Sequence, residues 1–70
     1  MHLDRAKALR PGDFVRCPAD RGDQPYKGKV LEDCSDSTVH TNYYGEQFIW
    51  VRVCHPTTRH HAVWPSNRLG

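Results

Sequence analysis

Residues 48–54, with the sequence FIWVRVC, constrain the fold of this chain more than any other segment. They form its longest run of β-branched and aromatic residues, which favour strands. Side chains two positions apart in a strand point to the same face, so Ile49, Val51 and Val53 form one row. This row predicts the floor of a hydrophobic core. The other face carries two aromatic rings, a guanidinium and a thiol, and we expect another strand, a second chain or a ligand to cover it.

Turn signals rich in Gly, Pro, Asp and Ser divide the rest of the chain into short segments. They predict four more strands, over residues 14–17, 28–32, 38–41 and 62–64, and a polar loop over residues 18–27. Five short strands separated by turns are typical of a small all-β barrel or sandwich. The expected core consists of the aliphatic residues of these strands, namely Val15, Val30, Ile49, Val51, Val53 and Val63, with Leu69 tucked beneath them.

The two ends of the chain have helical patterns. Leu3, Ala6 and Leu9 recur at helical spacing before Pro11 and Gly12 end the segment, so residues 1–11 predict a short helix or an arm. Residues 65–69 predict a one-turn helix. The 70 residues therefore make one small domain, with the barrel over residues 12–70. A core of this size supplies only about 3–5 kcal/mol.

Composition excludes several classes of function. The chain is 37% hydrophobic with a net charge of +2, which predicts a folded domain without the basic stripe of a dedicated DNA binder. The sequence has no apolar run long enough for a signal peptide or a membrane span, so we expect a cytoplasmic protein. It also lacks a nucleophile elbow, a phosphate-cradling glycine loop and an HExxH motif. We expect neither enzymatic activity nor a cofactor.

The cysteines and histidines are spaced poorly for a metal. The three cysteines, Cys17, Cys34 and Cys54, are odd in number and far apart, which predicts free thiols. His55, His60 and His61 lie near Cys54, and thiolate with imidazole suits zinc, but no CxxC pair is present. We therefore expect a polar hairpin loop here and no metal site.

The order of these segments resembles that of the SH3-like small barrels. GDFVR at residues 12–16 is similar to the opening strand of Tudor-type and KOW-type modules. GKV at residues 28–30 is similar to their second strand, and PSNRL at residues 65–69 to the single helical turn before their closing segment. The resemblance covers about residues 10–69 and implies a five-stranded SH3-like barrel. It implies no particular ligand.

A more distant resemblance is to plasmid-encoded type II dihydrofolate reductase, a short SH3-like chain with a similar opening strand. HP at residues 55–56 and WP at residues 64–65 match its outline. The segment VQIY, which contacts pterin and nicotinamide in that family, corresponds here to HAVW at residues 61–64 and lacks the glutamine. We transfer no catalytic residue. The resemblance implies, as an alternative function, an oligomeric enzyme whose site forms between subunits.

Aromatic and basic side chains are the candidate ligand groups. Loops and strands of the expected barrel carry Phe14, Tyr26, Tyr43, Tyr44, Trp50 and Trp64, and the first half of the chain carries Arg10, Arg16, Arg21, Lys27 and Lys29. Their plain interpretation is a core completed by large rings and a solvated charged face. The functional hypothesis is a binding face for DNA, RNA or a protein partner such as a peptide. It predicts a ligand site formed by Tyr26, Tyr43, Tyr44, Trp50, Arg16 and Lys29.

Overall fold

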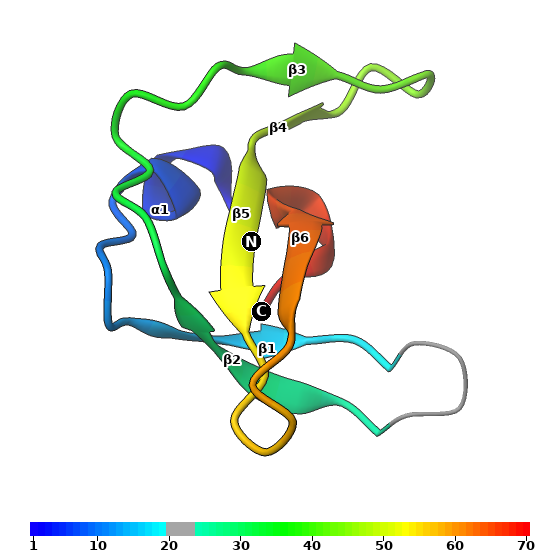
Figure 1. The fold of residues 1–70 in the computed structure, drawn as a ribbon. Helices are drawn as coiled ribbons and strands as arrows, with labels where there is room; N and C mark the ends of the chain where they lie inside the picture. The colour runs from blue at the N-terminus through cyan, green and yellow to red at the C-terminus, as the bar shows by residue number, and fades with distance from the viewer. Residues whose placement is uncertain (20–23) are drawn as a thin grey trace.

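The computed structural model describes residues 1–19 and 24–70, and most of its regular structure is β-strand (Figure 1). The elements in chain order are α1 (Leu3–Lys7), β1 (Phe14–Cys17), β2 (Tyr26–Val30), β3 (His40–Thr41), β4 (Gln47–Phe48), β5 (Trp50–Cys54), β6 (His61–Pro65) and the 3₁₀ turn η1 (Ser66–Arg68). The predictions of an all-β domain, a short N-terminal helix and a one-turn helix near the C-terminus are confirmed. Part of the predicted loop 18–27, residues 20–23, lies outside the described residues.

Four strands form one antiparallel sheet in the order β1-β2-β5-β6, and β3 pairs with β4 in a separate two-stranded sheet. The larger sheet consists of two ribbons, β1–β2 and β5–β6. Among the described residues, two strand pairs join β2 to β5, Lys29 with Cys54 and Val30 with Val53, and the Leu31 N–H donates to the Arg52 carbonyl at 3.0 Å. The ribbons therefore diverge from one corner, and Figure 1 shows β1 and β2 running across the direction of β5 and β6.

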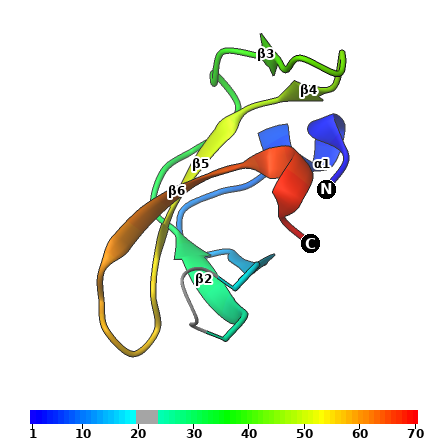
Figure 2. The same cartoon turned by 90° about the vertical axis from the view of Figure 1, so that its right-hand side faces the viewer.

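The core fills the inner face of this sheet. Val15, Val30, Ile49, Val51 and Val53 are all buried, as the alternating pattern predicts. Ala6 and Leu9 from the N-terminal segment and Leu69 after η1 complete the core. Figure 2 shows α1 beside the red C-terminal turn, near one end of the curved β5–β6 ribbon.

The prediction that Val63 is buried was wrong, because its side chain is 49% exposed. The register of β6 on β5 explains the difference: Val53 pairs with Ala62 and Val51 with Trp64, whereas Val63 pairs with Arg52. Residues paired across antiparallel strands share a face of the sheet. Ala62 and Trp64 therefore face inward and Val63 faces outward.

The two ribbons approach each other closely at Gly28, which is buried in the middle of β2. A Cβ atom at this position would lie 2.8 Å from the Cβ of Val53 and 2.9 Å from the Sγ of Cys17. Only a residue without a side chain fits at this distance. The glycine of the GKV motif is thus required by packing.

The predicted strand over residues 48–54 is divided at Ile49. The Ile49 N–H donates to Ser66 Oγ (3.1 Å), and the Ser66 N–H donates to the Ile49 carbonyl (2.9 Å). These bonds tie Ile49 to the start of η1, and β4 turns away to pair with β3. The described residues therefore contain six strands, where the sequence predicted five.

The C-terminal residue lies beside β1. Arg16 and Gly70 exchange two backbone hydrogen bonds, of 2.9 and 3.0 Å, on the edge of β1 that does not face β2. In the described part of the chain, no helix is long and apolar enough to cross a bilayer.

Candidate functional site

The outer face of the β1–β2 ribbon carries exposed cations. Antiparallel pairing places Arg16 opposite Lys27, and Phe14 opposite Lys29, and all four side chains are exposed. Arg16 and Lys29, two members of the predicted ligand site, therefore lie on the same face of the ribbon. Like charges directly opposite each other in a sheet are unfavourable, so the Arg16–Lys27 pair costs stability unless an anion lies nearby.

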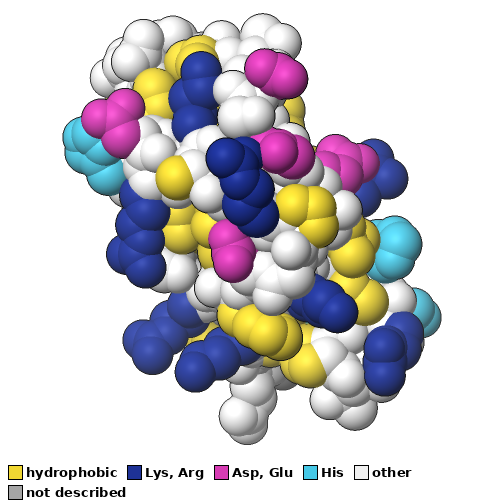
Figure 3. Space-filling model, turned by 90° about the vertical axis from the view of Figure 1, so that its left-hand side faces the viewer, with side chains coloured by type: hydrophobic (Ala, Val, Ile, Leu, Met, Phe, Trp, Pro, Cys, Tyr) yellow, Lys and Arg dark blue, Asp and Glu magenta, His cyan; other side chains and the backbone are white. Residues whose placement is uncertain are grey.

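The cations of this face differ in their partners. Arg52 on β5 lies 3.7 Å (Nε to Oε1) from Glu32. Arg10, in the segment before β1, donates from Nη1 to both carboxylate oxygens of Asp33, at 2.8 and 2.9 Å. Among residues 1–19 and 24–70, no carboxylate lies within 4.0 Å of Arg16, Lys27 or Lys29. In Figure 3, Lys and Arg side chains lie beside hydrophobic ones on the lower part of the face, while Asp and Glu side chains lie higher.

A shallow hollow of about 270 Å³ lies beside this pair of cations. Phe14, Arg16 and Lys27 contribute to its lining. The Phe14 ring is 63% exposed, so an apolar surface and two positive charges border the same hollow. This combination suits a ligand that has a flat apolar part and a negative charge.

Trp50 lies on the outer face of β5, opposite the Ile/Val row, and its side chain is 48% exposed. It belongs to a group of three rings. The Phe48 ring meets the Trp50 ring edge-on at a centroid distance of 5.2 Å, and the His40 ring stacks on Phe48 at 5.6 Å. The other rings hold Trp50 in position while half of its surface stays available. Among residues 1–19 and 24–70, no strand covers this face, so the expected covering by another strand is not seen.

Tyr43 and Tyr44 lie at the tip of the β3–β4 hairpin and are 96% and 82% exposed. The Asn42 side-chain oxygen accepts hydrogen bonds from the Tyr44 and Glu46 amides, both at 2.9 Å, and Gly45 has a φ of 82°. This tight turn presents both rings to solvent. Figure 1 shows the hairpin at the end of the molecule away from the β1–β2 ribbon.

Tyr26 does not lie with the cations. It is on β2 in alternation with the buried Gly28 and Val30, so its side chain is on the inner face of the sheet. There its hydroxyl accepts a hydrogen bond from Trp64 Nε1 at 3.0 Å. The six predicted site residues are thus placed in three regions: Arg16, Lys29 and Trp50 on the outer face, Tyr43 and Tyr44 on the hairpin, and Tyr26 inside.

Sequence reasoning missed two members of the outer face, Phe14 and Lys27. Both were noted as candidate ligand groups but were left out of the predicted site. The alternation of β1 and β2 would have found them, because Phe14 is two residues from Arg16 and Lys27 is two from Lys29. Arg21, another candidate cation, lies outside the described residues.

Two of the thiols are enclosed in the core. Cys17 and Cys34 are buried, and burial raises the pKa of each thiol above its ordinary value. Cys54 is partly exposed, with its Sγ 3.6 Å from the carbonyl oxygens of His55 and Arg59. Within the described residues, no three His, Cys, Asp or Glu side chains are grouped closely enough to hold a metal ion.

Comparison of the chain with protein-family models, with curated proteins and with solved structures found no match.

Proposed function

We propose that this chain is a binding module for single-stranded nucleic acid, and that the ligand lies on the outer face of the four-stranded sheet. One observation carries the proposal: Arg16, Lys27 and Lys29, which have no carboxylate partner among the described residues, share this face with the exposed rings of Phe14 and Trp50. Single strands offer bases that stack on such rings and phosphates that neutralise such cations.

The like-charged pair supports this ligand over an uncharged one. Arg16 and Lys27 stand directly opposite each other across β1 and β2, an arrangement that a bound phosphate would turn from unfavourable to favourable. Phe14 borders the same hollow, so a base attached to that phosphate has a ring to stack on. A peptide would use the aromatic surface but would leave the two cations opposed.

The chain order of the elements supports an SH3-like barrel as the frame of this face. The sheet order β1-β2-β5-β6, the 3₁₀ turn after β6 and the return of Gly70 to the edge of β1 follow the outline of such barrels. We include the closed barrel in the proposal. In this proposal, the two backbone hydrogen bonds between Arg16 and Gly70 would form the closing contact of the barrel.

The test is a titration of the ¹⁵N-labelled protein with single-stranded oligothymidine and oligouridine, and with a duplex of equal length, at several salt concentrations. We expect single strands to shift the amides of β1 and β2. Three phosphate contacts to a single strand give a slope of log K against log salt of about −2. Absence of any amide shift in these strands at low salt would refute the proposal, and a shift insensitive to salt would favour a peptide partner.

Two substitutions separate the contributions. Trp50→Ala removes a stacking surface and should weaken single-strand binding roughly tenfold or more, from about 1–3 kcal/mol per stacked base. Lys27→Ala should weaken binding and reduce the salt slope by about 0.7. Arg5→Ala is the matched control, since Arg5 is exposed on α1 away from this face. Light scattering on the same samples tests the alternative of an oligomeric enzyme, which requires more than one subunit.

A further inference from the structure

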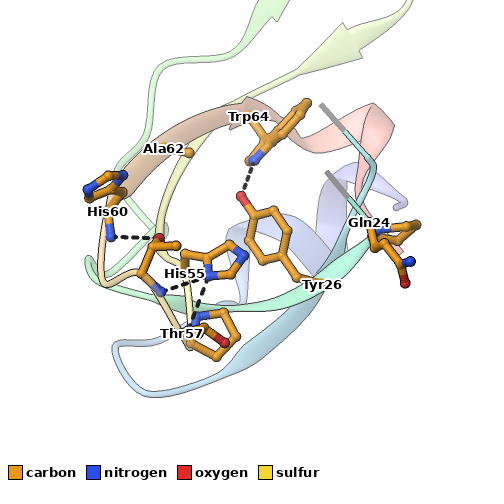
Figure 4. A pocket seen from close by; sticks show the side chains of 10 residues that line it. Gln24, Tyr26, His55, Thr57, His60, Ala62 and Trp64 are labelled. Atoms are coloured by element: carbon orange, nitrogen blue, oxygen red, sulfur yellow. Dashed lines mark hydrogen bonds between the residues drawn. The ribbon is translucent and has the colours of Figure 1, made fainter. Parts of the chain in front are cut away.

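The inner side of the sheet contains a second possible site, separate from the outer face. A cleft of about 560 Å³ lies where the β5–β6 hairpin diverges from the start of β2. Cavities of about 300–1,000 Å³ are usual for small-molecule sites. Tyr26, His55, Ala62 and Trp64 contribute its apolar and aromatic lining, and Thr57 and Thr58 contribute hydroxyls (Figure 4).

Contacts within the protein hold the rings of this cleft in place. The Trp64 indole N–H donates to the Tyr26 hydroxyl oxygen at 3.0 Å and so links β6 to β2. The His55 imidazole packs against the Tyr26 ring at a centroid distance of 4.4 Å and an angle of 44°. Figure 4 shows Tyr26 between His55 and Trp64. A flat ligand would therefore meet ring surfaces whose positions are already fixed.

The hydrogen bonds of His55 determine which of its nitrogens carries the proton. Nδ1 accepts from the backbone N–H groups of Thr57 (3.1 Å) and Thr58 (3.2 Å), so in the neutral ring the proton is on Nε2. Among the described residues, the Nε2–H group has no hydrogen-bond partner. It is a donor held in a fixed direction on the wall of the cleft.

Thr58 offers a second donor. Its hydroxyl oxygen accepts a hydrogen bond from the His60 amide at 3.3 Å, which leaves the hydroxyl hydrogen for another partner. The described lining of the cleft contains no Lys, Arg, Asp or Glu side chain. The described lining therefore combines ring surfaces and hydrogen-bond donors, and it contains no carboxylate, ammonium or guanidinium group to match a charged ligand.

We propose that this cleft binds an uncharged, planar heterocycle of up to about nucleoside size. Ring nitrogens or carbonyl oxygens on the edge of the ligand would accept from His55 Nε2–H and the Thr58 hydroxyl, and its flat surface would pack on the aromatic wall. This proposal does not rest on nucleic-acid binding, because the cleft and the cations are on opposite faces of the sheet.

The test uses adenosine, inosine and uridine as uncharged planar probes and glucose as a polar probe without an aromatic ring. We expect at least one nucleoside to shift the Trp64 indole N–H and the Ala62 amide in a saturable way, with a Kd below about 1 mM. Glucose should shift neither signal, and the Lys27 and Lys29 amides should not move. The absence of saturable binding by all three nucleosides, or shifts confined to the outer face, would overturn the proposal.

Two substitutions locate the binding. Ala62→Leu fills the cleft and should abolish saturation, whereas Ala8→Leu, at the exposed end of α1, should bind like the unmodified protein. His55→Ala removes the fixed donor and should weaken binding about fivefold to tenfold, whereas His61→Ala should not, because His61 does not line the cleft. Amide spectra confirm that each variant is folded. Unchanged affinity in both Ala62→Leu and His55→Ala would overturn the proposal.

Discussion

The two faces of the four-stranded sheet differ in how their polar groups are satisfied. On the outer face, Arg16 and Lys27 oppose each other without a carboxylate partner among the described residues, and Trp50 is half exposed. On the inner face, Tyr26 and Trp64 are joined by a hydrogen bond. On one side, the strands thus present Arg16 and Lys27 without a carboxylate partner among the described residues. On the other side, they present the aromatic rings of Tyr26 and Trp64, held by their hydrogen bond. This separation is a direct consequence of strand alternation.

The inner face is itself divided at Gly28. On one side of this residue, Val30 and Val53 pack in the closed aliphatic core, and on the other Tyr26 borders the open cleft. Gly28 marks the boundary because Val53 and Cys17 occupy the space that a side chain would need. The crossing of the two ribbons at this point therefore determines both the core and the cleft.

The largest effect is expected from Gly28→Ala, which would force the two ribbons apart. The new methyl group would lie within 3.0 Å of Val53 and Cys17, both of which are buried and cannot move aside. We expect a loss of about 3 kcal/mol in the free energy of unfolding, a large part of the stability of so small a domain. Urea denaturation followed by tryptophan fluorescence measures it.

The control is Ala8→Gly at the exposed end of α1, which measures the effect of exchanging alanine and glycine where no side chain is crowded. Gly45→Ala does not serve as a control, because Gly45 has a positive φ that strains any other residue. A Gly28→Ala protein that unfolds at the same urea concentration as the unmodified chain would show that the ribbons do not cross as closely as described.

A smaller effect should distinguish the two faces of the β5–β6 ribbon. Val51→Ala removes two methyl groups from the closed core and should cost about 2 kcal/mol. Val63→Ala makes the same change on the outer face and should alter stability by no more than about 0.5 kcal/mol. Thermal melts of both variants measure the contrast. Equal losses would mean that the outer face of β6 is covered in solution, for example by a second chain.

The sequence predicts the core of the central strand well because alternation is a local property. The spacing of Ile49, Val51 and Val53 alone predicts that they share one face, and all three are buried. The break at Ile49 was not predictable in this way, since it depends on hydrogen bonds to Ser66, 17 residues away in the chain. Local spacing determines which residues share a face, whereas contacts distant in sequence determine where a strand ends.

The faces on which Val63 and the site residue Tyr26 lie were harder to predict, because both depend on the register between strands. Val63 and Tyr26 each belong to a strand whose inward face is set by its neighbour, through the pairs Val63 with Arg52 and Tyr26 with Cys17. A shift of one residue would exchange the two faces of either strand. The sequence contains the alternation of both segments but not the pairing that selects one face as the inner one.

The smallest effect concerns the thiols, which report on the two faces separately. Cys17 is buried on the inner face, and Cys54 is partly exposed on the outer face opposite Lys29. Burial raises the pKa of the Cys17 and Cys34 thiols, so less of each is present as the reactive thiolate near pH 8. We expect Ellman's reagent to modify one thiol rapidly and two slowly, and Cys54→Ser to remove the rapid phase.

The same two thiols predict how stability changes at alkaline pH. Their pKa values are raised in the folded protein, so the unfolded chain loses these protons first as the pH rises through the ordinary thiol value of 9.0. The free energy of unfolding should therefore fall over that range, and the contribution of these thiols to stability is fully present below it. Urea denaturation between pH 7 and 10 measures the decline. For each protein, the free energy of unfolding at pH 10 is compared with that at pH 7, and the difference should be smaller for Cys17→Ala than for the unmodified chain. Three thiols reacting at one rate in the folded protein, with no alkaline decline, would show that the core is open to solvent around Cys17 and Cys34.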